Sequence, residues 1–556
     1  MGRMIENQSV FLRWKTMSAM VPTRGSLAAS MISAAVVVIA GCACIAAAQA
    51  PDTHVTGWPS YNRTLSSERY APFDQINSTN VSGLKQLCVY DLNIDSSIQT
   101  GPIVIDRTLY ATTDKEIFAI DADTCEQKWR VREEGPSIGQ RVNRGAAYLD
   151  GRLFRGTEEG DVLAYDAATG KKLWTTHLAD PQKGESVPAA PIAWSGLVFI
   201  GTAGSDRYGV AGRVYALEAQ TGKVVWETYT VPTDAPQPRN EKMQAQARLT
   251  WGNLNGVPIT GGGTWTTCTL DPKRGLLYVP VGNPGPDFAN QVRPGANLYT
   301  NSILVLDARS GIYRNHYSLV PADFHDWDLA AAPVLVTTKS GARVVAGAPK
   351  DGLLHVYDLT TDKKLYATPI TTRENDAASL STTPTRFCPG VAGGSEWNGP
   401  AFSPDTNLFY DGTVDWCHSV TLDLAELAKK PGQPWTGTEL AAQFGRKDPN
   451  WSGWVTATDA DTGQIKWQFH ATAPVLSGVT PTKGGLVFAG DMDKHAYAFD
   501  AATGKVLWRA ELPGAPGGGA IVYLVEGKER VAFVAGTRSA VFPVSPSSAK
   551  IVIFGL

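Results

Sequence analysis

Four side chains that stand apart from any repeated phrase carry groups able to hold a flat anionic ligand or a metal ion. Arg144 has a planar guanidinium, which suits a carboxylate. Trp265 follows a run of glycines, so its ring can lie flat under a planar ligand. Asn283 supplies an amide oxygen and Asp328 a carboxylate, and a hard cation prefers such oxygen ligands. Such residue types could serve a planar ligand, a carboxylate or a hard cation.

Other readings of the same residues are weaker. A zinc site formed by His325, Asp326 and Asp328 is conceivable, but one histidine with two aspartates in a loop is a poor zinc pattern. Asp328 could instead cap a turn, and Arg144 could be a surface arginine after a strand. No Ser/His/Asp or twin-carboxylate constellation supports a hydrolase.

The elements that must position these side chains are set by a repeat. The phrase Ala-x-Asp-Ala-x-Thr-Gly-Lys-x-x-Trp has five strong copies and two weaker ones. The strong copies are 119–129, 164–174, 216–226, 457–467 and 498–508, and the weaker ones are 305–314 and 356–365. A period of about 40–50 residues with turn chemistry and short β runs is typical of a β-propeller. The sequence therefore predicts an all-β fold with the tryptophans packed between sheets.

Each phrase has the chemistry of a β-hairpin. Alternating apolar residues precede the Asp, and the Asp-Ala-x-Thr-Gly segment is a tight turn in which Gly supplies a positive φ. Further strands are predicted at 101–111, 196–201, 275–281 and 485–490. Helical periodicity is nearly absent, and 422–429 is the one short candidate. Irregular insertions near 230–262 and 366–400 are where a binding face would be built.

Composition excludes several classes of function. The chain has 556 residues, 43% of them hydrophobic, which is enough for a large core. The net charge of -3 argues against an ordinary nucleic-acid binder and against a polybasic membrane-surface protein. We therefore expect no nucleic-acid partner.

The N-terminus resembles a targeting segment rather than part of the fold. Residues 26–48 are the one long apolar run, and four basic residues precede them, which is typical of a secretory signal. Cleavage after Ala48 fits the small-residue rule, so residues 49–556 are expected to form a single mature domain. A lipoprotein box ending at Cys42 and an uncleaved membrane anchor are alternatives. We expect a periplasmic protein without a stable membrane span once the signal is removed.

The cysteines suit an oxidising compartment, where disulfides are allowed. Cys388 and Cys417 are a predicted pair, and Cys88 with Cys125 is a possible one, which leaves Cys268 over. A C-x-x-C-H motif is absent, so no fused c-type haem is expected.

Seven stretches off the repeat, taken in order with the tryptophan phrases, resemble the pyrroloquinoline quinone (PQQ) dependent alcohol dehydrogenases. They are 142–145 (VNRG), 261–265 (GGGTW), 282–284 (GNP), 324–328 (FHDWD), 348–352 (APKDG), 388–398 (CPGVAGGSEWN) and 473–478 (APVLSG). The resemblance runs from about Trp58 to about Gly536. It implies an exported eight-bladed propeller with tryptophan-docking repeats and PQQ on its axis.

The resemblance also implies a set of cofactor contacts. Trp265 would be the aromatic floor, Arg144 would bind a carboxylate of PQQ, and Lys350 would donate to the quinone oxygen. Trp397 is the firmer match in its stretch, because the family usually has Asn before this Trp and the chain has Glu396 there. The remaining expected contacts are Asn398, Gln99, Gly204 and Ser205, with Gln99 at a position where the family usually has Glu.

By the same resemblance, Asn283, Asp328 and a third residue would bind the metal. The third ligand is Asp206 or, if the segment aligns from its other side, Arg207, whose guanidinium cannot bind a cation; we favour Asp206. Ala330 stands where the lanthanide-using relatives carry Asp, so Ca2+ is expected. Asp328 is the expected catalytic base: it would take the alcohol proton while hydride passes to the quinone and the metal acts as Lewis acid.

One departure from the family concerns the other face of the cofactor. Many members stack PQQ against a disulfide of adjacent cysteines, and residues 137–140 (SIGQ) contain none. This face is expected to be apolar or open, with a substrate different from a one-carbon alcohol.

The resemblance predicts a dehydrogenase that oxidises an alcohol to the aldehyde or ketone. It would pass its electrons to a soluble cytochrome c or a similar external acceptor. The alternative is a non-catalytic propeller scaffold of the outer-membrane assembly type, which lacks the ordered set Arg144, Trp265, Asn283, Asp328 and Lys350.

Overall fold

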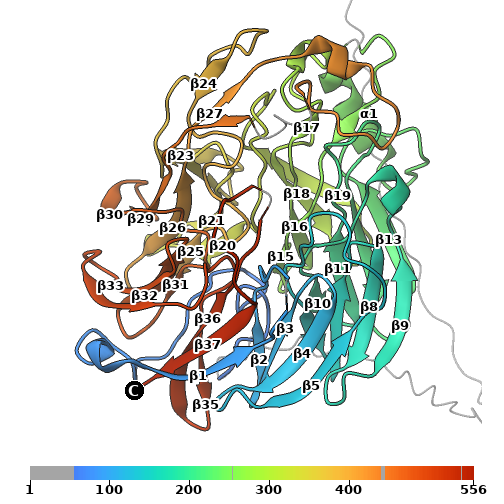
Figure 1. Ribbon diagram of the computed structural model, residues 1–556. Helices are drawn as coiled ribbons and strands as arrows, with labels where there is room; N and C mark the ends of the chain where they lie inside the picture. Colours follow the sequence, from blue (N-terminus) through green and yellow to red (C-terminus); the bar gives the residue numbers. More distant parts are fainter. Residues whose placement is uncertain (1–55, 95, 253, 440–444, 540) are drawn as a thin grey trace, which may run out of the picture. The chain divides into compact units, whose positions relative to one another are not determined.

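The computed structural model describes residues 56–94, 96–252, 254–439, 445–539 and 541–556 (Figure 1). The predicted signal, residues 1–48, and its cleavage site lie outside these described residues. The described residues belong to one compact unit, and within it β-strands predominate.

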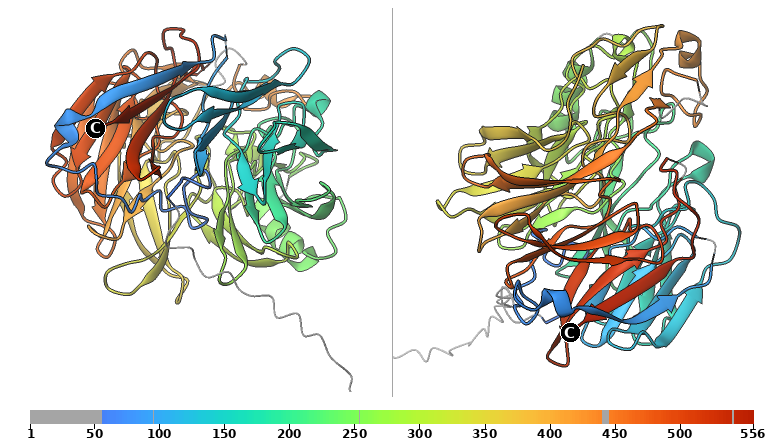
Figure 2. Two further views of the ribbon diagram at one scale, coloured as in Figure 1. Left: turned by 90° about the horizontal axis from the view of Figure 1, so that it is seen from below. Right: turned by 60° about the vertical axis from the view of Figure 1, so that its left-hand side comes forward.

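Eight four-stranded antiparallel sheets make up most of the described chain (Figures 1 and 2). In seven of them the strands are in chain order, and in two of these seven, strands of other sheets are inserted between the second and third strands. The first four are β2 (Ile103–Ile105), β3 (Thr108–Thr112), β4 (Glu116–Asp121) and β5 (Gln127–Arg132); β6 (Ala147–Leu149), β7 (Arg152–Gly156), β8 (Asp161–Asp166) and β9 (Lys172–His177); β10 (Ile192–Trp194), β11 (Leu197–Gly201), β12 (Arg213–Glu218) and β13 (Val224–Tyr229); and β15 (Thr269–Asp271), β16 (Leu276–Pro280), β18 (Ser302–Asp307) and β19 (Tyr313–Ser318).

The next three sheets continue the pattern. They are β20 (Val334–Thr337), β21 (Arg343–Gly347), β22 (Leu353–Asp358) and β23 (Lys364–Pro369); β25 (Ala401–Ser403), β26 (Leu408–Asp415), β29 (Ser452–Asp459) and β30 (Ile465–Ala471); and β31 (Thr480–Pro481), β32 (Leu486–Asp491), β33 (His495–Asp500) and β34 (Val506–Glu511).

The eighth sheet joins the two ends of the described chain. It contains β35 (Ile521–Val525), β36 (Lys528–Ala535) and β37 (Lys550–Gly555), and β1 (Lys85–Asp91) pairs antiparallel with β37. In Figure 1 the blue β1 accordingly lies beside the red strands. The eighth sheet also contacts the first sheet: the hydroxyl of Tyr523 donates to the carbonyl of Ala122, which follows β4. The first and last parts of the chain therefore stabilise each other.

Short elements fill the connections. They are the strand pair β14 (Thr260–Gly261) and β17 (Pro284–Gly285), the strands β24 (Thr385–Phe387), β27 (His418–Val420) and β28 (Arg446–Lys447), the helix α1 (Glu241–Arg248), and the 3-10 turns η1 (Val81–Gly83), η2 (Pro181–Lys183), η3 (Leu249–Trp251), η4 (Asn290–Val292) and η5 (Leu424–Leu427).

The repeated phrases form the predicted hairpins, each joining the last two strands of a sheet. In β8 and β9, Ala164 pairs with Trp174, a bulge follows, and Gly170 turns the chain with φ 73°. The four other strong copies repeat this register. The turn chemistry of the phrase is local, so it could be predicted from the sequence alone.

Each repeat tryptophan also contacts the following sheet or the chain segment that joins it. The indole of Trp174 donates to the carbonyl of Ala219, and a Cβ placed on Gly222 would lie 2.6 Å from the ring of Trp174. Trp226 makes the same contacts with Ala308 and Gly311. The turn glycine of one repeat thus makes room for the tryptophan of the preceding one.

Three sequence expectations need correction or extension. Residues 101–111 are two strands, because Asp106 (φ 51°) begins a tight turn between β2 and β3. The 422–429 helix is the single 3-10 turn η5, which is too short for an α-helix. The insertion 230–262 contains α1, which packs Met243 and Ala247 into the core.

Two further observations bear on the sequence predictions. Cys388 is bonded to Cys417 and Cys88 to Cys125, while Cys268 is free and buried, so both predicted pairs are confirmed. Within the described residues, the helices are too short and too polar to cross a bilayer.

Candidate active site

The predicted site residues lie on loops that leave different sheets. Arg144 lies between β5 and β6, Trp265 between β14 and β15, Asp328 between β19 and β20, and Lys350 between β21 and β22. These residues are separated by up to about 200 positions in the chain, yet all of them line one cavity of about 580 Å3. Gln99, Gly204, Ser205, Asp206 and Trp397 line the same cavity.

The aromatic and cationic groups of the cavity face one another. The guanidinium carbon of Arg144 lies 3.9 Å from the ring centroid of Trp397 and 5.3 Å from that of Trp265. The ammonium of Lys350 lies 5.8 Å from the Trp265 ring. Nη1 of Arg144 donates to Oε1 of Gln99, whereas Nε of Arg144 is buried without a partner. A flat anionic ligand on Trp265 would meet two cations at its edge.

Asp328 is held by three contacts. Its Oδ2 accepts from Nζ of Lys350 at 2.8 Å, and its Oδ1 accepts from the backbone N–H of Asn283 at 3.0 Å. The backbone N–H of Lys350 also donates to the carbonyl of Asp328. Gly282 makes this packing possible, since a Cβ at that position would lie 2.3 Å from Oδ1 of Asp328. The carboxylate is 8% exposed as a side chain and is fixed in orientation.

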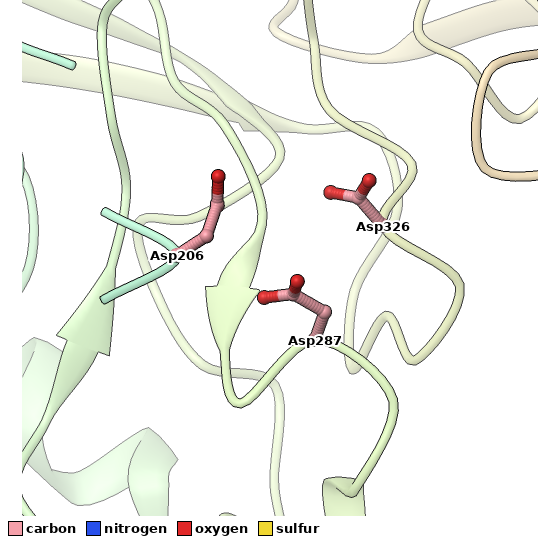
Figure 3. Close-up of side chains that lie close together, drawn as sticks. All are labelled: Asp206, Asp287 and Asp326. Atoms are coloured by element: carbon pink, nitrogen blue, oxygen red, sulfur yellow. The ribbon is translucent and has the colours of Figure 1, made fainter. Parts of the chain in front are cut away.

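Three further carboxylates meet beside it. Asp206, Asp287 and Asp326 come from three different loops, and their ligand atoms all lie within 4.8 Å of one another (Figure 3). Asp287 and Asp326 are buried, whereas Asp206 is exposed as a residue, and all three line the cavity. Arg207, the alternative to Asp206, donates to the carbonyl of Gly432. The chain thus places the carboxylate of Asp206, and not a guanidinium, in the cluster.

Asn283 is attached to this cluster through its amide. Nδ2 of Asn283 donates to Oδ1 of Asp287 at 3.0 Å. Its Oδ1 is buried and has no hydrogen-bond partner. An unpaired buried acceptor costs about 1–3 kcal/mol. The amide oxygen is therefore free to bind a cation.

The pKa values of all three carboxylates of the cluster are raised. The loss of hydration inside the cavity raises the pKa of Asp206 to about 6, with a further rise from the charge of Asp328. Burial also raises the pKa of Asp287 and of Asp326 well above the ordinary value. Burial alone would lower the pKa of Lys350, but the charges of Asp326 and Asp328 outweigh it and raise the pKa well above the usual range. Excess negative charge at this end of the cavity favours a cation.

Ser205 and Gly204 shape the floor of the cavity. The hydroxyl of Ser205 accepts from the backbone N–H of Gly263 at 2.8 Å, which ties the glycine run before Trp265 to the neighbouring loop. A Cβ on Gly204 would lie 2.2 Å from the carbonyl of Gly184, and its φ is 102°, so glycine is required there. Both residues set the position of the loops that carry Trp265 and Asp206.

Asn398 is the one predicted cofactor contact that does not line the cavity. Its Nδ2 donates to the carbonyl of Leu476 at 2.5 Å, and its Oδ1 accepts from the hydroxyl of Tyr61. Its neighbour Trp397 lines the cavity and donates Nε1 to the carbonyl of Gly517. Asn398 therefore helps to hold the loop that carries Trp397 in place.

Sequence reasoning did not assign roles to several acidic residues of the cavity. Asp287 lies close in sequence to Asn283, and Asp326 was considered for zinc alone. Burial raises the pKa of Glu396 to about 7 and that of Glu158 to about 7. The position of Glu396 next to Trp397 could have indicated a role in the site. No sequence feature distinguishes Glu158, because it follows a strand, as many surface residues do. Ile138 and Gln140, which belong to the cysteine-free segment 137–140, also line the cavity.

A family model and several relatives match the chain. The model described as the β-propeller domain of glucose, ethanol and alcohol dehydrogenases, a PQQ domain, matches residues 58–374, and the model of the outer-membrane protein assembly factor BamB matches residues 452–542. The quinohemoprotein alcohol dehydrogenase ADH-IIG of Pseudomonas putida is 30% identical over 88% of this chain and 74% of its own. The quinone alcohol dehydrogenase subunit of Acetobacter aceti is 31% identical over 89% of this chain and 73% of its own.

Solved structures agree with these matches. The chain superposes on quinohemoprotein alcohol dehydrogenase ADHIIG of Pseudomonas putida with a TM-score of 0.82 and 27% identity, covering 90% of this chain and 80% of that one. A europium-containing methanol dehydrogenase superposes with a TM-score of 0.78 and 27% identity, covering 90% and 98%. The fold is therefore an all-β propeller.

Proposed function

Because the chain belongs to the family of PQQ-dependent alcohol dehydrogenases, we propose that it oxidises an alcohol to the aldehyde or ketone. PQQ, when bound, supplies the quinone that accepts the hydride from the alcohol carbon. The observation that carries the proposal is the convergence of Arg144, Trp265, Asp328 and Lys350 on one cavity. An assembly scaffold would have no need for buried, mutually facing charges, so the BamB-like alternative is the weaker one.

The residues of the cavity fit PQQ by their chemistry. A volume of about 580 Å3 lies in the usual range for small-molecule sites. Trp265 provides a flat apolar surface, and Arg144 has an unpartnered Nε for an anionic group. Trp397, Gln99, Gly204 and Ser205 complete the walls.

Asp328 is proposed as the base that receives the alcohol proton. Its two oxygens are fixed by Lys350 and by the backbone N–H of Asn283, so its position beside a ring bound on Trp265 is set by the fold. Positioning of this kind supplies much of the catalytic effect in enzymes that use weak bases. Lys350 also lies over Trp265, where it can donate to an oxygen of a bound ring.

A hard cation is proposed at the carboxylate end of the cavity. Asn283 and Asp206 offer oxygen ligands there, and the unpartnered Oδ1 of Asn283 supports such a role. The cation would polarise the carbonyl beside it as a Lewis acid. The expectation of Ca2+ rests on Ala330 and remains a prediction; one relative is named as a lanthanide-dependent methanol dehydrogenase, from Methylacidiphilum fumariolicum.

The finer features of the fold are proposals too. We interpret the eight four-stranded sheets as eight blades, with each repeat tryptophan docking onto the next blade. Residues 49–556 would be the mature domain in the periplasm, and a soluble cytochrome c or similar carrier would take the electrons. Ile138 adds an apolar side chain to the lining of the cavity, which suits an alcohol larger than one carbon.

Reconstitution tests the proposal. The purified protein, freed of cofactor, should reduce an artificial dye with alcohols only after PQQ and Ca2+ or a lanthanide are added. The absorption spectrum of PQQ should also change when PQQ binds to the protein. Asp328→Asn is the matched variant, and it should bind PQQ with the same spectral change while losing most turnover. A protein that neither changes the PQQ spectrum nor reduces dye with any alcohol would contradict the proposal.

A further inference from the structure

The ligand set of the cation can be read from the carboxylates that the fold brings together. Asp206, Asp287 and Asp326 lie on three separate loops, and Figure 3 shows their carboxylates facing a common space. Their ligand atoms lie within 4.8 Å of one another, the separation expected of oxygens around one ion with metal–oxygen distances of about 2.3–2.6 Å. Two of the three, Asp287 and Asp326, are not in the ligand set that the sequence predicted.

An independent observation points to a ligand at the same place. Oδ1 of Asn283 is buried without a hydrogen-bond partner in a residue that is 1% exposed. Nδ2 of the same amide donates to Oδ1 of Asp287 at 3.0 Å, so the unpartnered oxygen lies beside the carboxylate cluster. A buried acceptor of this kind is costly unless a cation or another donor reaches it.

Asp328 has different partners. Both of its oxygens accept hydrogen bonds, one from Lys350 and one from the backbone of Asn283. Among the described residues, Asp328 is not part of the group whose ligand atoms meet within 4.8 Å. The hydrogen bonds of Asp328 thus suit a residue that faces a substrate, whereas the arrangement of the cluster suits the binding of an ion.

The charge of the region is not balanced by protein groups. Of the salt bridges in the described part of the chain, the one that reaches the cluster joins Lys350 and Asp326 at 3.7 Å, and the same ammonium is closer to Asp328. One ammonium therefore serves two carboxylates, and Asp206 and Asp287 have no basic side chain within salt-bridge distance in the described residues. Like charges at this separation repel strongly when they are withdrawn from water.

We infer that Asp206, Asp287, Asp326 and Asn283 together bind the hard cation, that Asp328 is not one of its ligands, and that the charge of this cage favours a trivalent lanthanide ion over Ca2+. The inference deepens the proposed function and rests on it for the presence of a cation. It departs from the Ca2+ expected from Ala330, because Asp287 and Asp326 supply carboxylates that the sequence prediction did not count. Three carboxylates neutralise a trivalent ion, whereas they leave a divalent ion with an excess negative charge. Because the attraction scales with the product of the charges, the third carboxylate adds more for the trivalent ion.

Terbium(III) is a suitable probe, because its luminescence rises when nearby indole rings such as Trp265 transfer energy to it. The full-length protein should bind terbium without added PQQ. Asp287→Asn and Asp326→Asn should each weaken terbium binding by about tenfold or more. Displacing bound terbium should require a much higher concentration of Ca2+ than of La3+. In Asp287→Asn, the ratio of these two concentrations should be smaller.

Two controls separate ligands from neighbours. Asp328→Asn should weaken terbium binding less than the Asp287 and Asp326 variants do, since it removes a neighbouring charge but no oxygen of the cluster. Glu185→Gln alters another carboxylate of the same cavity, one that is bonded to Arg213 at 2.5 Å, and it should retain terbium affinity. If the Asp287 and Asp326 variants bound terbium as well as the unmodified protein, or if Asp328→Asn weakened binding as much as they do, the ligand assignment would be wrong.

Crystals of the unmodified protein soaked in terbium give a test that does not depend on the folding of any variant. The anomalous peak should lie within bonding distance of carboxylate oxygens of Asp206, Asp287 and Asp326. A peak bonded to Asp328 and distant from Asp287 would overturn the inference, as would a protein that does not bind terbium. PQQ binding, followed by its absorption, is a separate readout, so the cage could fail while the dehydrogenase proposal stands.

Discussion

Nζ of Lys350 lies 2.8 Å from Oδ2 of Asp328, and both side chains are about nine-tenths buried. The same ammonium lies 5.8 Å from the ring centroid of Trp265. One ammonium therefore links the proposed base to the proposed floor of the cofactor site. The pair forms only when the loop that carries Asp328 and the loop that carries Lys350 are both correctly placed, so breaking it tests the arrangement of the site.

Removing Lys350 should destabilise the protein as well as inactivate it. Lys350→Met would leave Asp328 buried without its counter-ion, and breaking a buried pair in this way costs about 3–5 kcal/mol. We expect a matching fall in the free energy of unfolding, measured with denaturant, and loss of dye reduction. The control is Lys172→Met, which removes an ammonium 2.7 Å from Glu133 at a partly exposed pair and should change stability little. Equal effects of the two substitutions would argue against a buried ion pair.

Gly282 should be essential for the position of Asp328. A Cβ there would lie 2.3 Å from Oδ1 of Asp328, so Gly282→Ala must displace the carboxylate. A displacement of about 1 Å lowers turnover by about 100-fold. We expect this loss with the PQQ spectrum retained. Gly83→Ala is the matched control, because its Cβ would meet only Leu556 at an ordinary 3.6 Å; full activity in Gly282→Ala would contradict the geometry of the site.

Trp226 should be a major source of stability without any role in the site. It is 2% exposed, packs on the turn glycine Gly311 and donates to the carbonyl of Ala308. Trp226→Ala should lower the free energy of unfolding by roughly 3–5 kcal/mol, as measured by thermal or denaturant unfolding. KM and kcat at a temperature where the variant is folded should stay unchanged. A smaller loss than that of the half-exposed Leu173→Ala would contradict the docking interpretation.

Asp411 should make stability depend on pH. Both of its carboxylate oxygens are buried without partners, and burial raises its pKa to about 8. In the unfolded chain it ionises near pH 4. Between these values the folded protein holds one more proton than the unfolded chain, so this group costs stability increasingly as the pH rises from about 4 to about 8.

Asp411→Asn removes this titration. Relative to the unmodified protein, the variant should gain stability as the pH rises, by up to about 1.4 kcal/mol for each pH unit between the two pKa values. Unfolding curves collected from pH 5 to pH 8 measure the difference. Parallel pH profiles for the two proteins would show that Asp411 does not titrate in this range.

The hairpins could be predicted from the sequence because their determinants are local. Asp166, Thr169 and Gly170 form a turn whose hydrogen bonds lie within the phrase itself, and the alternation of apolar residues fixes the strands on either side. The same reasoning missed Tyr366, which takes the place of a repeat tryptophan. It packs on Gly463 and donates to Ala460, contacts that belong to the next sheet.

The identity of the site residues was accessible from their order in the sequence, but their partners were not. The sequence by itself determined that Arg144, Trp265, Asn283, Asp328 and Lys350 stand at loops between strands, because the motifs interrupt the repeat at fixed places. It could not decide between Asp206 and Arg207, since a loop without a repeat has no register in the sequence.

Only the tertiary structure brought Asp287 and Asp326 beside Asp206, and only the tertiary structure turned Asn398 toward Leu476. These outcomes depend on how loops from separate sheets pack against one another. Strand and turn formation is set by neighbours along the chain. The meeting of side chains roughly 80 to 120 residues apart is set instead by the packing of sheets on each other, a long-range property that short motifs do not encode.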